Sequence, residues 1–248
     1  MRAILTYHSI DPSGSVISVD RDTFRRHAEW LAQGSSRAVT VDELLAAPEG
    51  DDCVAVVFDD AFENFGSVAW PILRDLELPA TVFVVSGQVG ATNAWAGVHE
   101  PRIPTLPLLD WDALGRLAED GVHIGSHTRT HPPLDAVPAA SLHDEIEGSA
   151  VDLESRLGRR PRGFAYPFGK VDDGSETVAR STYDWACTTE LALVAGDSAR
   201  HRLPRLDAFY YRRPGQLEAW GTAAFRGRLG IRRTARGARS WLAKRRAS

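Results

Sequence analysis

Short apolar runs alternate with longer segments of helical periodicity along most of the chain. Runs predicted as strands cover residues 3–8, 54–58, 80–86, 121–127, 163–169, 184–190 and 202–209. Segments predicted as helices cover residues 23–33, 67–76, 111–120 and 141–158. This alternation is typical of an α/β fold with a mainly parallel sheet, and about seven units in about 210 residues favour a barrel over an open sheet.

Capping residues and one long irregular segment divide these elements. Thr40 is a plausible N-cap for a short helix, and Gly158 is predicted to end the helix that precedes it. Residues 88–110, rich in Gly and Pro, form the longest irregular segment and carry Trp95 and His99. At this length the segment is either a substrate loop or a surface excursion.

The composition is that of an ordinary globular protein. The chain has 248 residues, of which 43% are hydrophobic and 25% are charged. Its opening residues, MRAILTYHSI, lack an extended apolar region and a cleavage site, and no run approaches the ~18 apolar residues that span a bilayer. The two cysteines, Cys53 and Cys187, lie in strand-like contexts. We therefore predict buried thiols, a reducing compartment and a cytoplasmic location.

Charge is distributed unevenly, because residues 225–248 contain eight Arg, one Lys and no acid. Without these nine positive charges, the remaining 20 basic and 33 acidic residues give the rest of the chain a net charge near −13. The tail is either an amphipathic helix on an anionic membrane or a disordered, solvated end. Nothing else resembles a base-reading module, so nucleic acid is not expected. The apolar residues of the tail are Phe225, Leu229, Ile231, Trp241 and Leu242.

Two adjacent carboxylates end the strand in VAVVFDDAFENF, residues 54–65. Asp59 and Asp60 repel each other and resist desolvation, so their position suggests a nearby cation, a general base, or both. The alternative is a helix N-cap next to one solvated aspartate.

Further polar residues follow other predicted strands. His8 ends the first strand, His127 follows GVHIGS, and Tyr166-Pro167-Phe168 follows GFA. The carboxyl ends of parallel strands share one face, where active sites of such folds lie, so these residues should converge.

The segment HTRTH places His127 and His131 at a spacing that suits a divalent metal, although by itself it also suits two solvated histidines. An aspartate from the neighbouring strand end completes three ligands and leaves a position open for water, while the second aspartate can take a proton from that water. Zinc is the first choice, and Co²⁺, Ni²⁺, Mn²⁺ and Fe²⁺ are alternatives.

Three motifs in order, FDD, GSHTRTH and FAYPFG, resemble the polysaccharide deacetylase family, also called the NodB homology domain. The resemblance covers residues 1 to about 210 and implies a distorted (β/α)7 barrel. We accordingly divide the chain into a catalytic barrel, residues 1–215, and a basic tail, residues 216–248. The implied reaction is metal-dependent hydrolysis of an N-acetyl or O-acetyl group on a sugar.

The resemblance also implies a role for individual residues. Asp59 becomes the general base, and the metal ligands become Asp60, His127 and His131. The backbone N–H of Phe168 would donate to the oxyanion. The implied substrate-binding residues are Tyr166, Pro167, Phe168 and Trp185.

The sequence departs from the commonest family pattern in three places. Ala61 replaces a glycine, Ala165 replaces the arginine that orients the base, and no Leu-x-His segment supplies a general acid near the C-terminus. Tyr-His on the first strand and AYP-aromatic-Gly resemble the exopolysaccharide-type branch. We therefore hypothesise that His8 is the general acid and that Arg205 pairs with Asp59; the alternatives are a structural histidine and a surface arginine.

The leading functional hypothesis is a deacetylase acting on an N-acetylhexosamine in a cell-surface glycan or its lipid-linked precursor, in the cytoplasm or at the inner face of the membrane. A second hypothesis keeps the barrel and metal but changes the substrate to a non-sugar amide or imide. The third is a glycan-binding module that has lost catalysis, motivated by the missing arginine and histidine.

Overall fold

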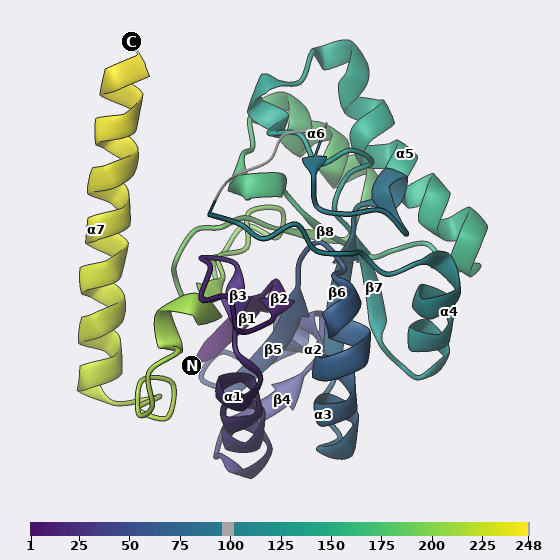
Figure 1. Ribbon diagram of the computed structural model, residues 1–248. Helices are drawn as coiled ribbons and strands as arrows, with labels where there is room; N and C mark the ends of the chain where they lie inside the picture. The colour runs from purple at the N-terminus through teal and green to yellow at the C-terminus, as the bar shows by residue number, and fades with distance from the viewer. Residues whose placement is uncertain (96–101, 248) are drawn as a thin grey trace.

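A curled parallel sheet surrounded by helices forms the body of the protein (Figure 1). The computed structural model describes residues 1–95 and 102–247, with side chains as far as residue 236. The strand order is β10–β1–β5–β6–β7–β8–β9, with β4 beside the first half of β5. These strands are β1 (Arg2–Tyr7), β4 (Arg37–Val39), β5 (Cys53–Phe58), β6 (Ala80–Val84), β7 (His123–Ser126), β8 (Gly163–Ala165), β9 (Trp185–Cys187) and β10 (Leu206–Asp207).

Helices cover the outside of this sheet, and two short strands, β2 (Ser9–Ile10) and β3 (Ser18–Val19), pair separately. The helices are α1 (Arg21–Gln33), α2 (Val41–Ala46), α3 (Trp70–Asp75), α4 (Trp111–Glu119), α5 (Ala139–Leu157), α6 (Asp173–Thr182) and α7 (Ala223–Ala247). A π-helical stretch, Phe65–Ala69, leads into α3.

The segment of residues 203–207 brings the two edges of the sheet toward each other. The backbone N–H of Leu203 donates to the Ala186 carbonyl of β9 at 2.9 Å. A few residues later, Leu206 pairs in parallel with Leu5 of β1. The same short stretch is thus bonded to the last strand at its start and to the first strand at its end. The predicted α/β fold with a curled, barrel-like parallel sheet is confirmed.

Alternation along the strands separates the barrel interior from the surrounding helices. Interior side chains such as Ile4, Val57 and Phe83 belong to one buried cluster, whereas their strand neighbours pack outward against helices. Because every second residue faces the same side, His8 continues the interior row of β1 and Asp59 continues that of β5. Both side chains therefore reach the mouth of the barrel.

The predicted helix ends are confirmed, and several short elements were missed. The Thr40 hydroxyl accepts from the Glu43 N–H at 3.2 Å, and Gly158 ends α5 with a φ of +71°. Sequence analysis did not identify β2, β3, β4 or α6. The last of these lacks an apolar stripe, because its buried residues are only Ser175, Val178 and Ala179.

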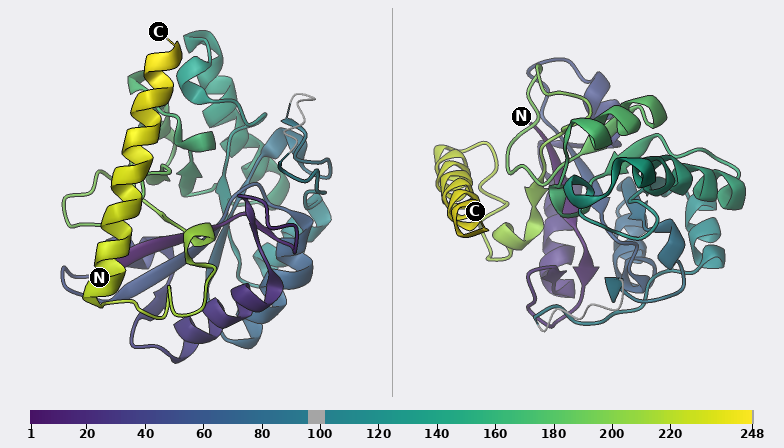
Figure 2. Two further views of the ribbon diagram at one scale, coloured as in Figure 1. Left: turned by 60° about the vertical axis from the view of Figure 1, so that its left-hand side comes forward. Right: turned by 90° about the horizontal axis from the view of Figure 1, so that it is seen from above.

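The basic tail contains the helix α7, which runs along one side of the barrel (Figures 1 and 2). Phe225 is 1% exposed and stacks on Tyr211, and Leu229 is also buried, so the prediction that these two side chains face a membrane is wrong. Phe225 also contacts Trp220, and both Phe225 and Leu229 belong to the main hydrophobic cluster of the protein. Ile231 is exposed. The side chains of Trp241 and Leu242 lie outside the described part.

Two predictions concern the environment of the chain. Cys53 and Cys187 are buried free thiols, as expected. Among the described residues, no helix is long and apolar enough to cross a membrane. The compartment remains a prediction. His99 lies outside the described residues.

Candidate metal centre and active site

The two adjacent aspartates turn sharply at the end of β5. Asp59 continues the strand, with its N–H donating to the Tyr7 carbonyl at 3.0 Å. Asp60 and Ala61 then have φ angles of +71° and +56°. The glycine that the resemblance implies at position 61 would adopt this left-handed conformation without steric strain. For Ala61 the same conformation costs about 1–2 kcal/mol. It lets neighbouring carboxylates contact different partners.

The ring of His127, directly after β7, is oriented so that Nε2 can bind a metal. Its Nδ1–H donates to the Ala165 carbonyl of β8 at 2.6 Å, which leaves the Nε2 lone pair free. That Nε2 lies 3.5 Å from Oδ1 of Asp60. Burial lowers the pKa of His127 to about 4, so the imidazole is neutral at neutral pH, as a metal ligand must be.

His131 completes a cluster of three buried ligands. Its Nε2 lies 3.3 Å from the same Oδ1 of Asp60. Ligand atoms of Asp60, His127 and His131 all lie within 4.8 Å of one another. Oδ1 of Asp60 is buried without a hydrogen-bond partner between two imidazoles. A divalent cation would satisfy this oxygen, so the residues fit the metal predicted from the sequence.

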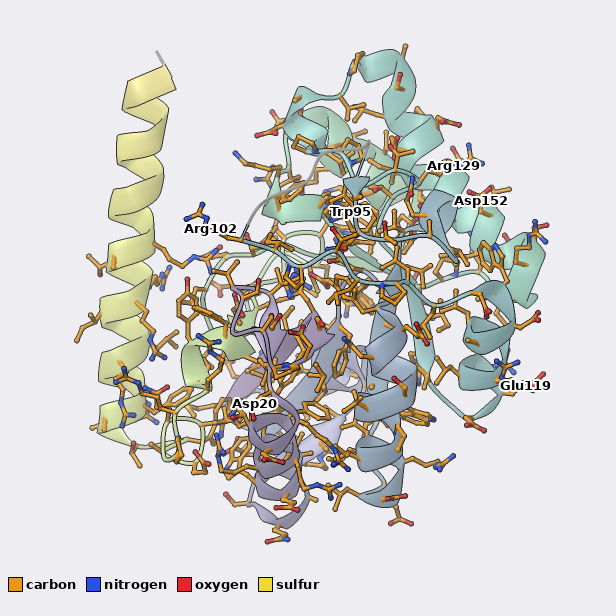
Figure 3. All side chains as sticks on the ribbon, viewed as in Figure 1. Asp20, Trp95, Arg102, Glu119, Arg129 and Asp152 are labelled. Atoms are coloured by element: carbon orange, nitrogen blue, oxygen red, sulfur yellow. The ribbon has the colours of Figure 1, made fainter. Side chains whose placement is uncertain are left out.

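Helix α5 holds the loop that carries both histidines. The buried carboxylate of Glu145 accepts from the backbone N–H groups of Arg129 and Thr130 at 3.1 and 3.0 Å. Asp152, two turns further along the same face of α5, accepts from the Arg129 guanidinium at 2.8 and 2.7 Å, and Figure 3 shows these two side chains together. Sequence analysis missed Glu145 and Asp152. Their spacing of seven, which places two acids on one helix face, was the available signal.

A buried ion pair joins Asp59 to Arg205, as predicted. The guanidinium donates from Nη1 to Oδ1 at 2.7 Å and from Nη2 to Oδ2 at 2.9 Å, while its Nε donates to the Thr188 carbonyl at 2.8 Å. Burial alone would raise the pKa of Asp59, but Arg205, followed by His127 and His8, outweighs it and holds that pKa well below its usual range. Asp59 is therefore a carboxylate.

His8 lies on the other side of Asp59. Its Nε2 is 3.6 Å from Oδ2 of Asp59, and 25% of its side chain is exposed. A small cavity of about 60 Å³ adjoins it and is lined in part by Arg205, Asp207 and Arg236 of α7. The structure thus brings the predicted acid to the mouth of the barrel, where it can meet both Asp59 and solvent.

Of the substrate-binding residues predicted in the motif FAYPFG, only some lie at the candidate site. Phe168 has a φ of +58° and is 55% exposed, and its ring meets that of His131 with centroids 4.7 Å apart. Pro167 beside it is buried. Tyr166, by contrast, is fully buried and packs on Phe164 among the residues under α5 and α6. Strand alternation turns its ring away from the mouth, so a substrate contact by this side chain is not supported.

Trp185 also lies away from the site. It starts β9, at the opposite end of the strands, where it is 3% exposed and packs on Phe83. Its indole N–H donates to Asp42 at 3.2 Å. The sequence prediction that it binds substrate is corrected: Trp185 is a core residue at the amino end of the sheet.

Strained backbone is concentrated around the candidate metal centre. Among the described residues, five of the six non-glycine positions with positive φ lie in the turns that carry the site. They are Asp60, Ala61, Thr128, His131 and Phe168. Such conformations persist where surrounding contacts hold them, and they are typical of functional sites.

The Arg205–Asp59 pair predicts a specific dependence of stability on pH. In Arg205→Ala the carboxylate stays buried without its partner, which destabilises the fold by about 3–5 kcal/mol at neutral pH. The wild-type pair stabilises the fold above the unfolded pKa of about 3.9 and loses this contribution only as pH falls through the lower folded pKa. In Arg205→Ala, burial without the guanidinium raises the folded-state pKa of Asp59. Acidification then protonates the buried carboxylate and should reduce the destabilisation. The stability difference should therefore narrow from about pH 7 to pH 4.5.

Urea denaturation with a chelator present measures this difference without a contribution from bound metal. Arg162→Ala is the matched control, because Arg162 pairs with Asp184 at the exposed surface and should contribute less than about 1 kcal/mol. A gap for Arg205→Ala that stays constant or widens on acidification contradicts the assigned pair.

Comparisons with known proteins agree with this geometry. The family described as Polysaccharide deacetylase matches residues 46–183, more than half of the chain. A poly-beta-1,6-N-acetyl-D-glucosamine N-deacetylase of Staphylococcus epidermidis is 25% identical over 210 residues, which cover 77% of this chain and 70% of that protein.

Two solved structures have a similar fold. IcaB from Ammonifex degensii has a TM-score of 0.74 at 23% identity, covering 88% of this chain and 95% of that chain. Streptococcus pyogenes deacetylase PplD, in complex with acetate, has a TM-score of 0.70 at 22% identity, covering 83% and 91%. With the family match and the candidate metal centre both in place, the chain belongs to the polysaccharide deacetylase family.

Proposed function

We propose that this protein is a divalent-metal-dependent deacetylase that removes the N-acetyl group of an N-acetylhexosamine in a polysaccharide or its lipid-linked precursor. The observation that carries the proposal is the buried Asp60, His127 and His131 cluster next to an ionised Asp59. The substrate class is supported by the family and by the relative whose name specifies N-acetyl-D-glucosamine.

Asp59 is the proposed general base. Arg205 binds both of its oxygens, so the carboxylate keeps one orientation and is already ionised when substrate arrives. A divalent metal held by Asp60, His127 and His131 would polarise the acetyl carbonyl and lower the pKa of the attacking water. Because the pKa of Asp59 is itself low, its carboxylate would take a proton only from water made more acidic in this way. The proton then resides on Asp59 beside Arg205.

His8 and Phe168 are proposed to act on the two ends of the scissile bond. His8, protonated, would donate to the departing amine, and its position beside Asp59 places both proton carriers at one mouth. The backbone N–H of Phe168, in a left-handed turn against His131, would donate to the oxyanion. Pro167 and the exposed Phe168 ring would contact the acetyl group and the sugar.

Replacing the proposed base tests the reaction. Asp59→Asn removes the proton acceptor but leaves the three metal ligands, so kcat for acetate release should fall about 10²–10⁴-fold with metal content unchanged. Acetate would be measured from oligomers of N-acetylglucosamine and from lipid-linked precursors, with metal-replete enzyme. Asp112→Asn, an exposed position on α4, is the control. Metal-bound wild type that releases no acetate from any acetylated sugar would favour a non-sugar amide substrate or a binding module.

Changing the leaving group of the substrate distinguishes a general acid at His8 from a structural histidine. His8→Ala should lower kcat on an acetamido sugar about 10²-fold or more, because the amine must be protonated as it leaves. On 4-nitrophenyl acetate, whose leaving group needs no proton, the same variant should lose little. His143→Ala, on the exposed face of α5, controls for removal of an imidazole. Equal losses on both substrates would make His8 a structural residue.

We further propose that the distal part of α7 contacts an anionic membrane surface. The first turns of α7 pack against the barrel through Phe225 and Leu229, so only the remainder of the helix can contact a membrane. Support comes from its charge, since Arg239, Lys244, Arg245 and Arg246 extend the basic run without any acid. A substrate linked to lipid would be encountered at the same surface.

Vesicle partitioning tests this membrane contact. Replacing Lys244, Arg245 and Arg246 by Ser should reduce binding to vesicles containing anionic lipid about 100-fold at low salt, at roughly 1 kcal/mol per charge. Neutral phosphatidylcholine vesicles are the control and should not bind either protein appreciably. Wild type that fails to sediment with anionic vesicles ends this proposal.

A further inference from the structure

The two candidate histidine ligands are held in different ways. The ring of His127 is fixed through Nδ1 by the Ala165 carbonyl. Nδ1 of His131 is buried but has no hydrogen-bond partner. Ligating histidines normally use their second nitrogen to fix the ring, so some other contact must set the orientation of His131.

Aromatic rings supply that contact. The Trp95 indole stacks on the His131 imidazole with centroids 4.3 Å apart and planes at 28°. Phe168 meets it edge-on, with centroids 4.7 Å apart and planes at 67°. Phe168 is 55% exposed, whereas Trp95 is partly buried, so Trp95 provides the more enclosed contact surface. Figure 3 shows Trp95 over the end of the sheet.

Trp95 itself is carried by a well-anchored segment. The Asn93 side chain bridges its two limbs, donating to the Pro104 carbonyl at 3.0 Å and accepting from the Leu106 N–H at 2.7 Å. The backbone N–H of Leu108 donates to the Ala91 carbonyl at 3.0 Å. These bonds hold residues 90–93 against residues 104–109.

The same segment is bonded to the turn that follows the two aspartates. Leu109 N–H donates to the Ala61 carbonyl at 2.9 Å, and Glu63 N–H donates to the Pro107 carbonyl at 3.0 Å. Hydrogen bonds therefore connect the turn after Asp60 with Asn93, two residues before the indole that stacks on His131. The same segment thus contacts the surroundings of two candidate ligands.

We propose that Trp95 is a positioning residue for the metal centre, which fixes the His131 ring by stacking in place of a hydrogen bond to Nδ1. The inference rests on the proposed metal-dependent function. The long irregular segment would then orient the metal ligand His131, in addition to any contact with substrate. An aromatic ring is needed at position 95 because an aliphatic side chain cannot stack face to face on an imidazole.

Metal affinity tests this role without measuring turnover. Zn²⁺ dissociation constants of the full chain would be obtained by competition with a chromophoric chelator, and the visible band of the Co²⁺ form would report ligand geometry. Trp95→Leu should weaken Zn²⁺ binding about 10–100-fold and alter the Co²⁺ band, whereas Trp95→Phe should stay within about threefold of wild type. Trp111→Ala, on α4, is the control for loss of an indole and should bind Zn²⁺ as wild type does.

The outcomes separate this inference from the proposed function. Thermal melting followed by circular dichroism verifies folding, and if Trp95→Leu fails to fold, Trp95→Tyr against Trp95→Met gives the same aromatic-to-aliphatic comparison. Wild-type Zn²⁺ affinity and an unchanged Co²⁺ band in the aliphatic variant would overturn the role of Trp95 while leaving the metal centre intact. Wild type that binds no divalent metal would overturn both.

Discussion

The buried ion pair between Arg205 and Asp59 connects closure of the sheet with chemistry at its mouth. Arg205 lies in the short segment that is bonded to β9 at Leu203 and to β1 at Leu206. A buried carboxylate without a partner costs several kcal/mol, so Asp59 can be ionised at the end of β5 only because this segment delivers a guanidinium to it. The segment that closes the curled sheet therefore also keeps the candidate base ionised once it is buried.

Strain at the mouth depends on this framework. Five left-handed non-glycine residues, at about 1–2 kcal/mol each, would relax if their turns were free. Glu145 holds the turn around Arg129 and Thr130, and the Leu109 N–H holds Ala61. Rigid elements thus keep the three ligands close together although Oδ1 of Asp60 and Nδ1 of His131 have no hydrogen-bond partner. The consequence is a preorganised cluster whose geometry does not have to be assembled by the metal alone.

The sequence analysis placed the residues at the strand ends correctly but missed contacts that depend on details of the tertiary structure. Asp59, Asp60, His8 and the two histidines of HTRTH could be placed together because parallel strands bring their carboxyl ends to one face. The orientation of Tyr166 could not be inferred, since β8 has only three residues, all buried, and its sequence gives no apolar–polar alternation from which the two faces could be told apart. Trp185 was misassigned although the predicted strand, residues 184–190, already placed it near the amino end, away from the face where the carboxyl ends meet.

Contacts from distant elements were equally inaccessible. Glu145 lies 15 residues or more from the N–H groups it accepts from, and Trp95 lies in a segment that carries no periodic signal. Only their placement in the folded chain shows that they support His131 and its loop. By contrast, the Arg205–Asp59 pair was reached indirectly, from the absence of an arginine at position 165 and the resemblance to the exopolysaccharide-type branch.

Position 165 also shows which functions survive a change of side chain. The resemblance places an arginine there, and its replacement by Ala165 leaves the base without a local partner. The backbone carbonyl of the same residue still accepts from Nδ1 of His127, since that bond does not depend on the side chain. Only the lost ion pair had to be replaced, and Arg205 does so from the closing segment of the sheet. His131, held by side chains rather than by backbone, is the ligand whose support is open to such changes.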